Sequence, residues 1–213
     1  MSAQTIQERK NPPTRKNQRG AGRHTLCRNC NSNTGSWYVP AYLSWAQQGW
    51  RNAYSTPSLV VHRPFEIEPL AVTKQIIAMF ASACGASFFR NRPDLVRFVL
   101  NRTETGLPID VRLYTYYVHP MSSASRQSGI TGHMDFEKSP VTYIHAEIAF
   151  PPFGYVLCLK SPPPDSRLFE ITFMADASPG EMRTLNLKPP ALHVNSFVPC
   201  DFRSEAEIDT SFN

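Results

Sequence analysis

The sequence predicts an α+β fold, with helices in the N-terminal half and an antiparallel sheet of about six strands after them. Three observations support this prediction. With 213 residues, 41% of them apolar, the chain can bury a sizeable core. Apolar residues recur at helical spacing between residues 72 and 83, whereas from residue 111 onward they alternate. The predicted strands are joined by Pro- or Gly-containing turns, which are too short for the crossover helices of a parallel sheet.

Residues 1–24 form a basic tail, which we expect to be disordered because it contains almost nothing that can be buried. Six of the 22 Lys and Arg residues lie here against one of the 17 Asp and Glu residues, so the tail carries the whole net charge of +5. The rest of the chain is charge-balanced. We therefore expect a DNA or RNA partner to be attracted through the tail, while a merely solubilising tail is the alternative.

Residues 25–55 are predicted to form a zinc-knuckle-like strand, turn and helix. The stretch Thr25 to Cys27 is typical of a short strand that enters a turn, and the polar stretch Asn31 to Gly35 favours a continued turn. Aromatic residues then follow at a spacing that fits a helix restarting after Pro40. We expect these rings to pack in the core, with stacking on nucleic-acid bases as the alternative. They are Trp37, Tyr38, Tyr42, Trp45 and Trp50.

Residues 56–213 are predicted to form an α+β domain of unassigned role. A short strand is expected over residues 58–62. The helix after it should begin at Pro69, a favoured first-turn residue, and end at Gly85, a favoured stop. Its apolar stripe places Lys74 on the opposite face. A second helix is predicted to begin at Pro93.

Strands are expected in the remainder of the chain. The alternation over residues 111–117 predicts a half-buried strand. His145 and Glu147 would share one face of a later strand, because alternate residues of a strand point the same way. A satisfied polar pair on a solvated sheet face is the favoured interpretation there, and a catalytic or metal-binding pair is the alternative. The further strands are predicted at 128–135, 141–150, 154–160, 167–175 and 182–188.

The five cysteines favour a reducing compartment. Their number is odd, and only Cys27 and Cys30 are closely spaced, so they do not form a disulfide framework. The N-terminus has no apolar core of a signal peptide, and no apolar stretch is long enough to span a bilayer. We therefore expect a cytoplasmic protein without a membrane partner.

The spacing Cys27-X-X-Cys30 provides half of a structural zinc site. Two thiolates two residues apart in a tight turn can reach one tetrahedral ion, which needs four ligands. His24 is a third candidate ligand, and Cys200 or His193 would have to fold back as the fourth. The alternative is a pair of reduced cysteines in a small turn.

The segment Leu26 to Tyr38, read as LCRNCNSNTGSWY, resembles the second half of an HNH-type zinc-finger endonuclease module. The resemblance covers about residues 9–50. It implies structural zinc on Cys27 and Cys30. It also implies that Asn31, which opens the helix, and the nearby Asn33 lie on the side of a catalytic Mg²⁺ or Mn²⁺. The implied activity is metal-assisted hydrolysis of a phosphodiester.

The chain departs from the pattern of that family upstream of the cysteines. Lys10, in Arg9-Lys10-Asn11-Pro12-Pro13, occupies the position of the His that acts as general base, and a first Cys-X-X-Cys pair is absent. A protonated Lys repels a divalent cation and cannot replace imidazole. We therefore expect a nucleic-acid-associated HNH relative that is degenerate or N-terminally truncated. The alternative is a non-catalytic interaction or assembly protein whose knuckle is only structural.

Overall fold

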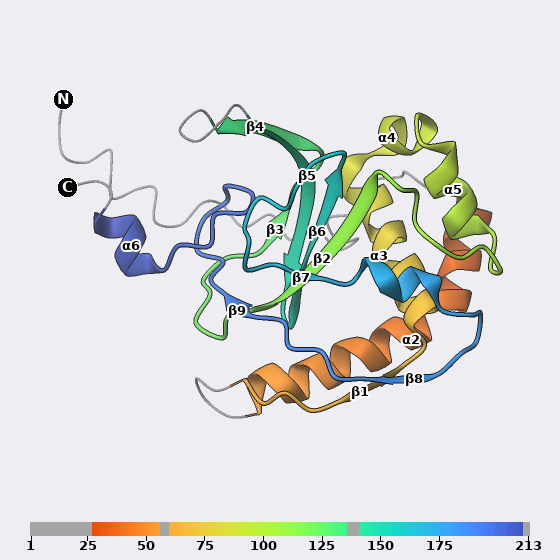
Figure 1. Cartoon of the computed structure of the whole chain (residues 1–213), viewed down its shortest axis with the longest axis horizontal. Coiled ribbons are helices and arrows are strands. Elements are labelled where there is room, and N and C mark those ends of the chain that lie inside the picture. The colour runs from red at the N-terminus through yellow and green to blue at the C-terminus, as the bar shows by residue number, and fades with distance from the viewer. Residues whose placement is uncertain (1–26, 56–59, 136–140, 211–213) are drawn as a thin grey trace.

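The computed structural model describes residues 27–55, 60–135 and 141–210. Within these ranges the chain is mixed α+β, as predicted, with most helices on one side of a largely antiparallel sheet (Figure 1). The predicted tail 1–24, His24 and residues 58–59 lie outside the described residues. Residues 60–64 are not a strand, and the strand expected before the first core helix lies instead at β1, Phe65–Ile67.

The first described helix, α2, spans Arg28–Tyr54 without a break, so two predictions about this segment are wrong. The stretch Asn31 to Gly35 is helical rather than a turn, and the helix passes through Pro40. Cys27 precedes α2 as its N-cap, and its Sγ accepts a hydrogen bond from the backbone N–H of Cys30 at 3.1 Å. The Thr34 hydroxyl donates to the carbonyl of Cys30, so this polar residue bonds within the helix instead of breaking it.

α2 is fixed to the sheet by Trp45, which is completely buried. Its ring stacks on Phe153 at 4.4 Å between centroids, and its indole N–H donates to the Tyr155 hydroxyl at 2.8 Å. Gly49 allows this close approach, because a Cβ there would lie 2.3 Å from the Phe153 ring. α2 therefore belongs to the same core as the later helices and the sheet.

The two helices predicted from their first-turn prolines are confirmed. α3 spans Pro69–Cys84 and ends at Gly85, whose φ of 85° is the left-handed conformation that favours glycine. α5 spans Pro93–Leu100 and buries an apolar face. The structure adds two short helices, α4 at Ala86–Arg90 and α6 at Glu205–Thr210.

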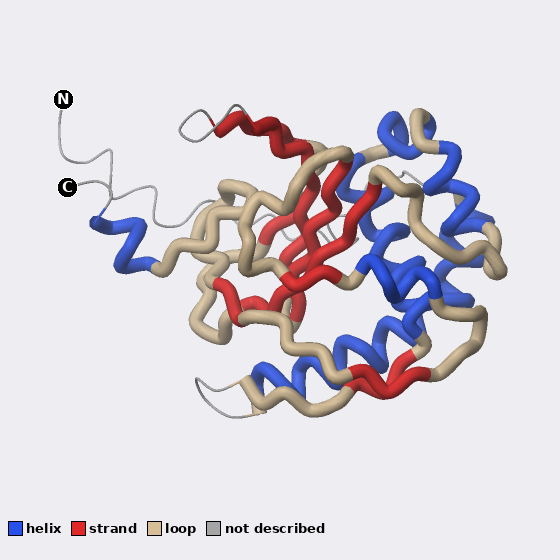
Figure 2. Tube along the Cα trace, viewed as in Figure 1, coloured by secondary structure: helices blue, strands red, loops and turns tan. Residues whose placement is uncertain are grey.

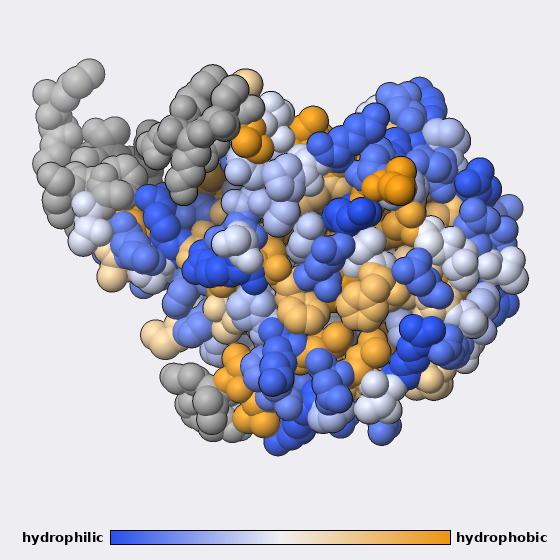
Figure 3. All heavy atoms as spheres, viewed as in Figure 1, coloured by the Kyte–Doolittle hydropathy of each residue, from blue (hydrophilic) through white to orange (hydrophobic). Residues whose placement is uncertain are grey.

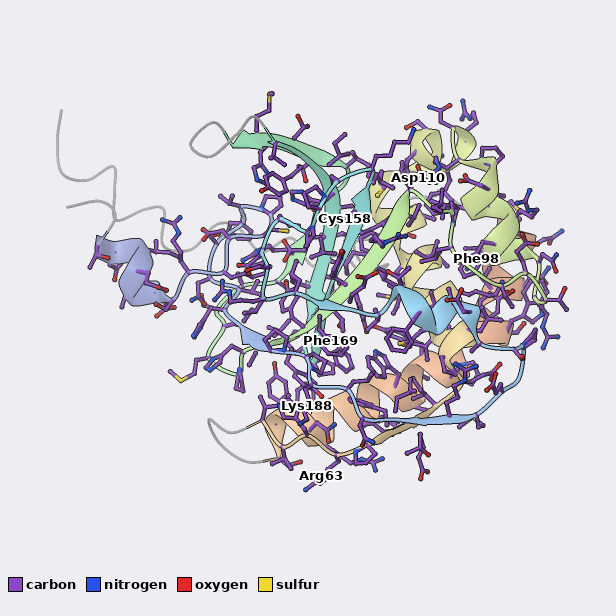
Figure 4. The ribbon with its side chains drawn as sticks, viewed as in Figure 1. Arg63, Phe98, Asp110, Cys158, Phe169 and Lys188 are labelled. Atoms are coloured by element: carbon purple, nitrogen blue, oxygen red, sulfur yellow. The ribbon has the colours of Figure 1, made fainter. Side chains whose placement is uncertain are left out.

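The solvated position predicted for Lys74 is wrong, because α3 is buried nearly all round. The Lys74 ammonium group donates to the carbonyl of Phe98 and, at 2.8 Å, to that of Asn101. These carbonyls belong to the C-terminal end of α5, which has no helical donors left for them. Burial lowers the pKa of Lys74 to about 8. Phe98, which Lys74 also approaches at 4.2 Å from the ring centroid, is labelled in Figure 4.

The strands form one large sheet and one small one (Figure 2). In the large sheet the order β3-β5-β6-β2-β7 is antiparallel, β4 pairs with β5, and β9 adds a parallel pairing to β2 that alternation did not predict. The predicted strand 167–175 is only two residues long and continues as the 3₁₀ helix η2, Thr172–Asp176. β8, Arg183–Leu185, pairs with β1 in the small sheet. The remaining bounds are β2 Val111–Val118, β3 Arg126–Gln127, β4 Thr131–Asp135, β5 Val141–Phe150, β6 Phe153–Leu159, β7 Phe169–Glu170 and β9 Ala191–Leu192.

Both faces of the large sheet are covered. The helices cover one face, and a C-terminal segment, defined here as residues 191–203, crosses the other (Figure 1). The half-buried strand predicted at 111–117 is therefore buried on both sides. In the view of Figure 3, apolar residues gather over the middle of the molecule and hydrophilic residues surround them. The second apolar cluster consists of Tyr114, Tyr116, Val118, Ala149, Val156, Cys158, Leu168, Leu192, Val194 and Phe202.

Candidate functional sites

Cys27 and Cys30 lie one helical turn apart at the exposed start of α2. Their sulfur atoms are 2.8 Å apart and share a hydrogen bond. That bond, together with the backbone N–H of Cys30, lowers the pKa of the Cys27 thiol, whereas the same shared bond raises the pKa of Cys30. Cys27 is therefore the first of the two to become a thiolate, the form that binds a metal ion.

The thiol pair has the donor type and convergence of half a tetrahedral zinc site. Zinc–sulfur bonds of about 2.3 Å set ligand sulfurs about 3.8 Å apart, so the two atoms would have to separate by roughly 1 Å. A side-chain rotation at the first turn of a helix can supply this change.

The other predicted ligands do not join the thiols within the described residues. Across residues 27–55, 60–135 and 141–210, no group of three or more His, Cys, Asp and Glu side chains could hold a metal ion. α2 begins on the right of Figure 1, whereas the segment that contains His193 and Cys200 lies on the left. Neither residue is a fourth ligand in this arrangement, and the prediction for His24 falls on residues that are not described.

The helix separates the two asparagines that were predicted for a catalytic metal. Both are exposed in the first two turns of α2. Positions three and four apart share a helix face, so Asn31 neighbours Cys27 and Asn33 neighbours Cys30. The two asparagines are two positions apart and lie about 200° apart around the helix. They therefore flank the thiol pair from opposite sides.

An apolar cavity of about 290 Å³ adjoins the thiol pair. It is lined by residues of α3, α4 and α5, and Cys27 and Cys30 contribute to its wall. Its lining is mainly apolar, with Arg90 as its one charged side chain, so it lacks the converging polar groups of a metal-dependent phosphodiesterase site. Its other lining residues are Ala78, Ala81, Ala86, Phe89, Arg90, Val96, Val99 and Leu100.

The aromatic residues of α2 divide between the core and the surface. Trp45 and Tyr38 are buried, which agrees with the predicted core packing. Trp50 is 51% exposed and stacks on Tyr54 at 4.4 Å between centroids. The Tyr54 hydroxyl in turn donates to the carbonyl of Val118 in β2, which fixes this stack to the sheet.

The second candidate site surrounds Glu147 on β5, and the predicted solvated face is wrong. Glu147 and His145 are 0% and 1% exposed, because the C-terminal segment covers their side of the sheet. Arg126 of β3 donates to both carboxylate oxygens of Glu147 at 3.0 Å. The Tyr116 hydroxyl and the backbone N–H of Cys200 donate to the same carboxylate at 2.5 and 2.7 Å. Four donor contacts therefore compensate this buried charge.

Comparisons with other proteins give no family for the chain. No protein-family model, no curated protein and no solved structure matches it. The described helices include none with the length and apolar character needed to cross a membrane.

Proposed function

We propose that the chain is a nucleic-acid-associated relative of HNH-type endonucleases that does not itself cut nucleic acid. In this proposal Cys27 and Cys30 supply two ligands of a structural zinc site at the start of α2. The basic residues of 1–24 contact phosphates, and the protein acts in the cytoplasm.

The convergence of the Cys27 and Cys30 thiols at the start of α2 is the observation that carries the proposal. Two convergent thiols followed directly by Asn31 agree in order and residue type with the segment that carries the resemblance, although the helix begins at Arg28 and not at Asn31. Zinc, when bound there, would hold the start of α2 in place through the two sulfurs. Among the described residues, these two thiols are the only ligands that the chain brings to such an ion.

We expect no hydrolysis, because the segment that resembles the module lacks a general base and a set of converging ligands for a catalytic metal ion. Lys10 occupies the position of the general base. Asn31 and Asn33 lie about 200° apart around α2, so the two amides do not converge. A catalytic Mg²⁺ or Mn²⁺ would therefore have one of the two asparagines, not both, as its candidate ligand in this part of α2, which is too few for a dedicated protein site.

A zinc measurement on the purified chain tests the thiol site. Two ligands per chain predict less than one equivalent of zinc by elemental analysis, and about half an equivalent if one ion joins two chains. Cys27→Ser combined with Cys30→Ser should reduce zinc to background, whereas Cys84→Ser, the matched control, should leave it unchanged. Stoichiometric zinc together with nicking of plasmid DNA in Mg²⁺ or Mn²⁺ would refute the non-cutting assignment.

A salt titration tests the nucleic-acid assignment. Binding of labelled DNA should weaken as salt rises, because each phosphate contact releases counterions. Replacing the six Lys and Arg residues of 1–24 with Gln in the full chain should flatten this dependence. The absence of binding at low salt would instead favour the non-catalytic assembly protein.

A further inference from the structure

A cavity of about 350 Å³ lies between the large sheet and the C-terminal segment. On the sheet side it is lined by residues of β4 and β5, including His133 and His145, and on the other side by Val198, Pro199 and Cys200. It is separate from the thiol pair of α2, whose own cavity is lined by other residues. Cys158, labelled in Figure 4, is the cross-strand neighbour of His145 on β6 and marks this part of the sheet.

His145 is the unusual residue of the cavity wall. Its side chain is buried, yet neither ring nitrogen has a hydrogen-bond partner among the described residues. Burial of an unpaired polar group costs about 1–3 kcal/mol, and a native fold seldom retains such a group without a use for it. The exposed His133 lies beside it, at 5.5 Å between ring centroids, and stacks on Tyr143.

The charges around the cavity are already paired with one another. Glu147 receives its donors from Arg126, Tyr116 and Cys200. Arg126 also donates to the carbonyls of Ser196 and Asp201. The Asp201 carboxylate accepts from Arg203 and, at 2.8 Å, from the hydroxyl of Ser196. Among the described residues, the wall therefore offers no free cation for an anionic ligand and no free carboxylate for a cationic one.

The wall opposite His145 is held in place by the same network. Cys200 has a φ of 57°, which is uncommon for a residue with a side chain. This conformation coincides with the hydrogen bond from its backbone N–H to Glu147. The C-terminal segment is thus attached to the sheet beside His145, and the cavity exists before any ligand enters.

We propose that this cavity binds a small uncharged heterocycle of nucleobase type through the ring nitrogens of His145. A neutral imidazole presents one donor and one acceptor, and nucleobase edges carry the complementary groups. Pro164, Val198 and Pro199 supply the apolar surface that a planar ring needs. The volume lies near the lower end of the range for ligand pockets, about 300–1,000 Å³, and suits a single ring system.

The protonation state of His145 agrees with an uncharged ligand. Burial, and to a smaller extent the neighbouring His133, lowers the pKa of His145 to about 4. The ring is therefore neutral at physiological pH and keeps both its donor and its acceptor.

Nitrogen-15 NMR of the histidine rings tests the inference on the full chain. Adenine and uracil, which are uncharged at neutral pH, should each shift the His145 ring signals, with dissociation constants below about 1 mM. His145→Leu should weaken binding roughly tenfold or more, because the buried hydrogen bond is lost. His62→Leu, at an exposed position outside the cavity, is the matched control and should bind normally.

The same titration with short single-stranded oligonucleotides distinguishes the source of the heterocycle. If the His145 signals shift with free bases alone, the ligand is of metabolite size. If they shift with free bases and with oligonucleotides, the ligand is an unpaired base of a strand. Either result supports the site. Unchanged His145 signals with every probe would leave water as the partner of the ring and overturn the inference, as would equal binding by His145→Leu. Thermal unfolding of His145→Leu at or above the wild-type temperature excludes misfolding as the cause of lost binding.

Discussion

At the scale of single residues, Glu147 and its partners hold three sheet strands, β2, β3 and β5, and the C-terminal segment together. Both Arg126 and Glu147 are buried, with 1% and 0% of their side chains exposed. A buried ion pair adds little net stability compared with a pair of well-packed apolar side chains. Loss of one partner is costly, however, because it leaves the other charge buried and unpaired. The network therefore makes its members sensitive to single substitution.

Arg126→Met should lower the free energy of unfolding by about 3–5 kcal/mol, because Glu147 then loses both of its charged contacts. Urea denaturation is the measurement. Glu170→Gln is the matched control, since the Arg112–Glu170 pair is exposed and joined at 3.6 Å, and exposed pairs contribute about 0–1 kcal/mol. A loss for Arg126→Met no larger than the control would contradict the role given to the network.

His145 predicts a pH dependence of stability in acid. Its pKa is about 4 in the folded chain against an ordinary value of 6.5, so the unfolded chain binds more protons between these values. Stability is full above pH 6.5 and falls as the pH drops toward 4, by up to about 1.4 kcal/mol per pH unit. His145→Leu should flatten this dependence of the unfolding free energy on pH, as measured by urea denaturation between neutral pH and pH 4. An unchanged slope would mean that other groups, such as His119, dominate the acid response.

The pairing of His145 and Glu147 on one strand face could be predicted from the sequence, but their burial could not. The period of two residues fixes the shared face. The cover comes from residues 191–203, far along the chain, where only two residues are in a strand and no apolar period marks the segment. Only the folded chain brings Phe202 over Tyr116, at 5.0 Å between ring centroids.

At the scale of elements, α3 and α5 were predictable because each carries its own start signal. Pro69 and Pro93 both open a helix in the structure, and Gly85 ends the first. α2 contains the opposite signals in Asn31, Asn33, Gly35 and Pro40. Its first turns form nevertheless, since the side chains of Cys27 and Thr34 bond locally and Trp45 anchors the helix to the sheet. Tertiary packing decides against local propensity here.

Two glycines of α2 give a matched test of that packing. Gly49→Ala should destabilise the protein by more than about 1 kcal/mol, because its Cβ would lie 2.3 Å from the Phe153 ring and force the helix or the ring to move. A Cβ added at Gly35 would meet nothing within 4 Å, so Gly35→Ala should stabilise the same helix by about 0.5–1 kcal/mol. Thermal melts compare the two. Equal effects of the two substitutions would show that α2 does not press on the sheet.

At the scale of the whole molecule, the sheet has two covered faces built in different ways. Helices predicted from periodicity cover one face, and a segment with little regular structure covers the other. The alternating pattern and short turns predicted an antiparallel sheet, and the antiparallel pairings of β2, β5 and β6 agree with it. The parallel pairing of β9 was not predictable, because two residues are too few to carry a pattern.

Phe202→Ala tests the second face. Phe202 is 5% exposed and packs on Tyr116, so its loss should lower the free energy of unfolding by about 3–4 kcal/mol. Phe197→Ala is the control within the same segment, because Phe197 is 87% exposed and should change stability by less than about 0.5 kcal/mol. Chemical denaturation distinguishes them. Similar small losses would mean that the C-terminal segment rests on the sheet without stabilising it.

All three tryptophans of the chain lie in one helix, at positions 37, 45 and 50 of α2. Intrinsic fluorescence excited at the indole band therefore reports on this helix alone, and mainly on Trp45 as it leaves the rings of Phe153 and Phe65. Circular dichroism averages over the backbone of the entire molecule. A difference between the two transitions on heating would reveal that α2 undocks before the sheet opens, without any label being added.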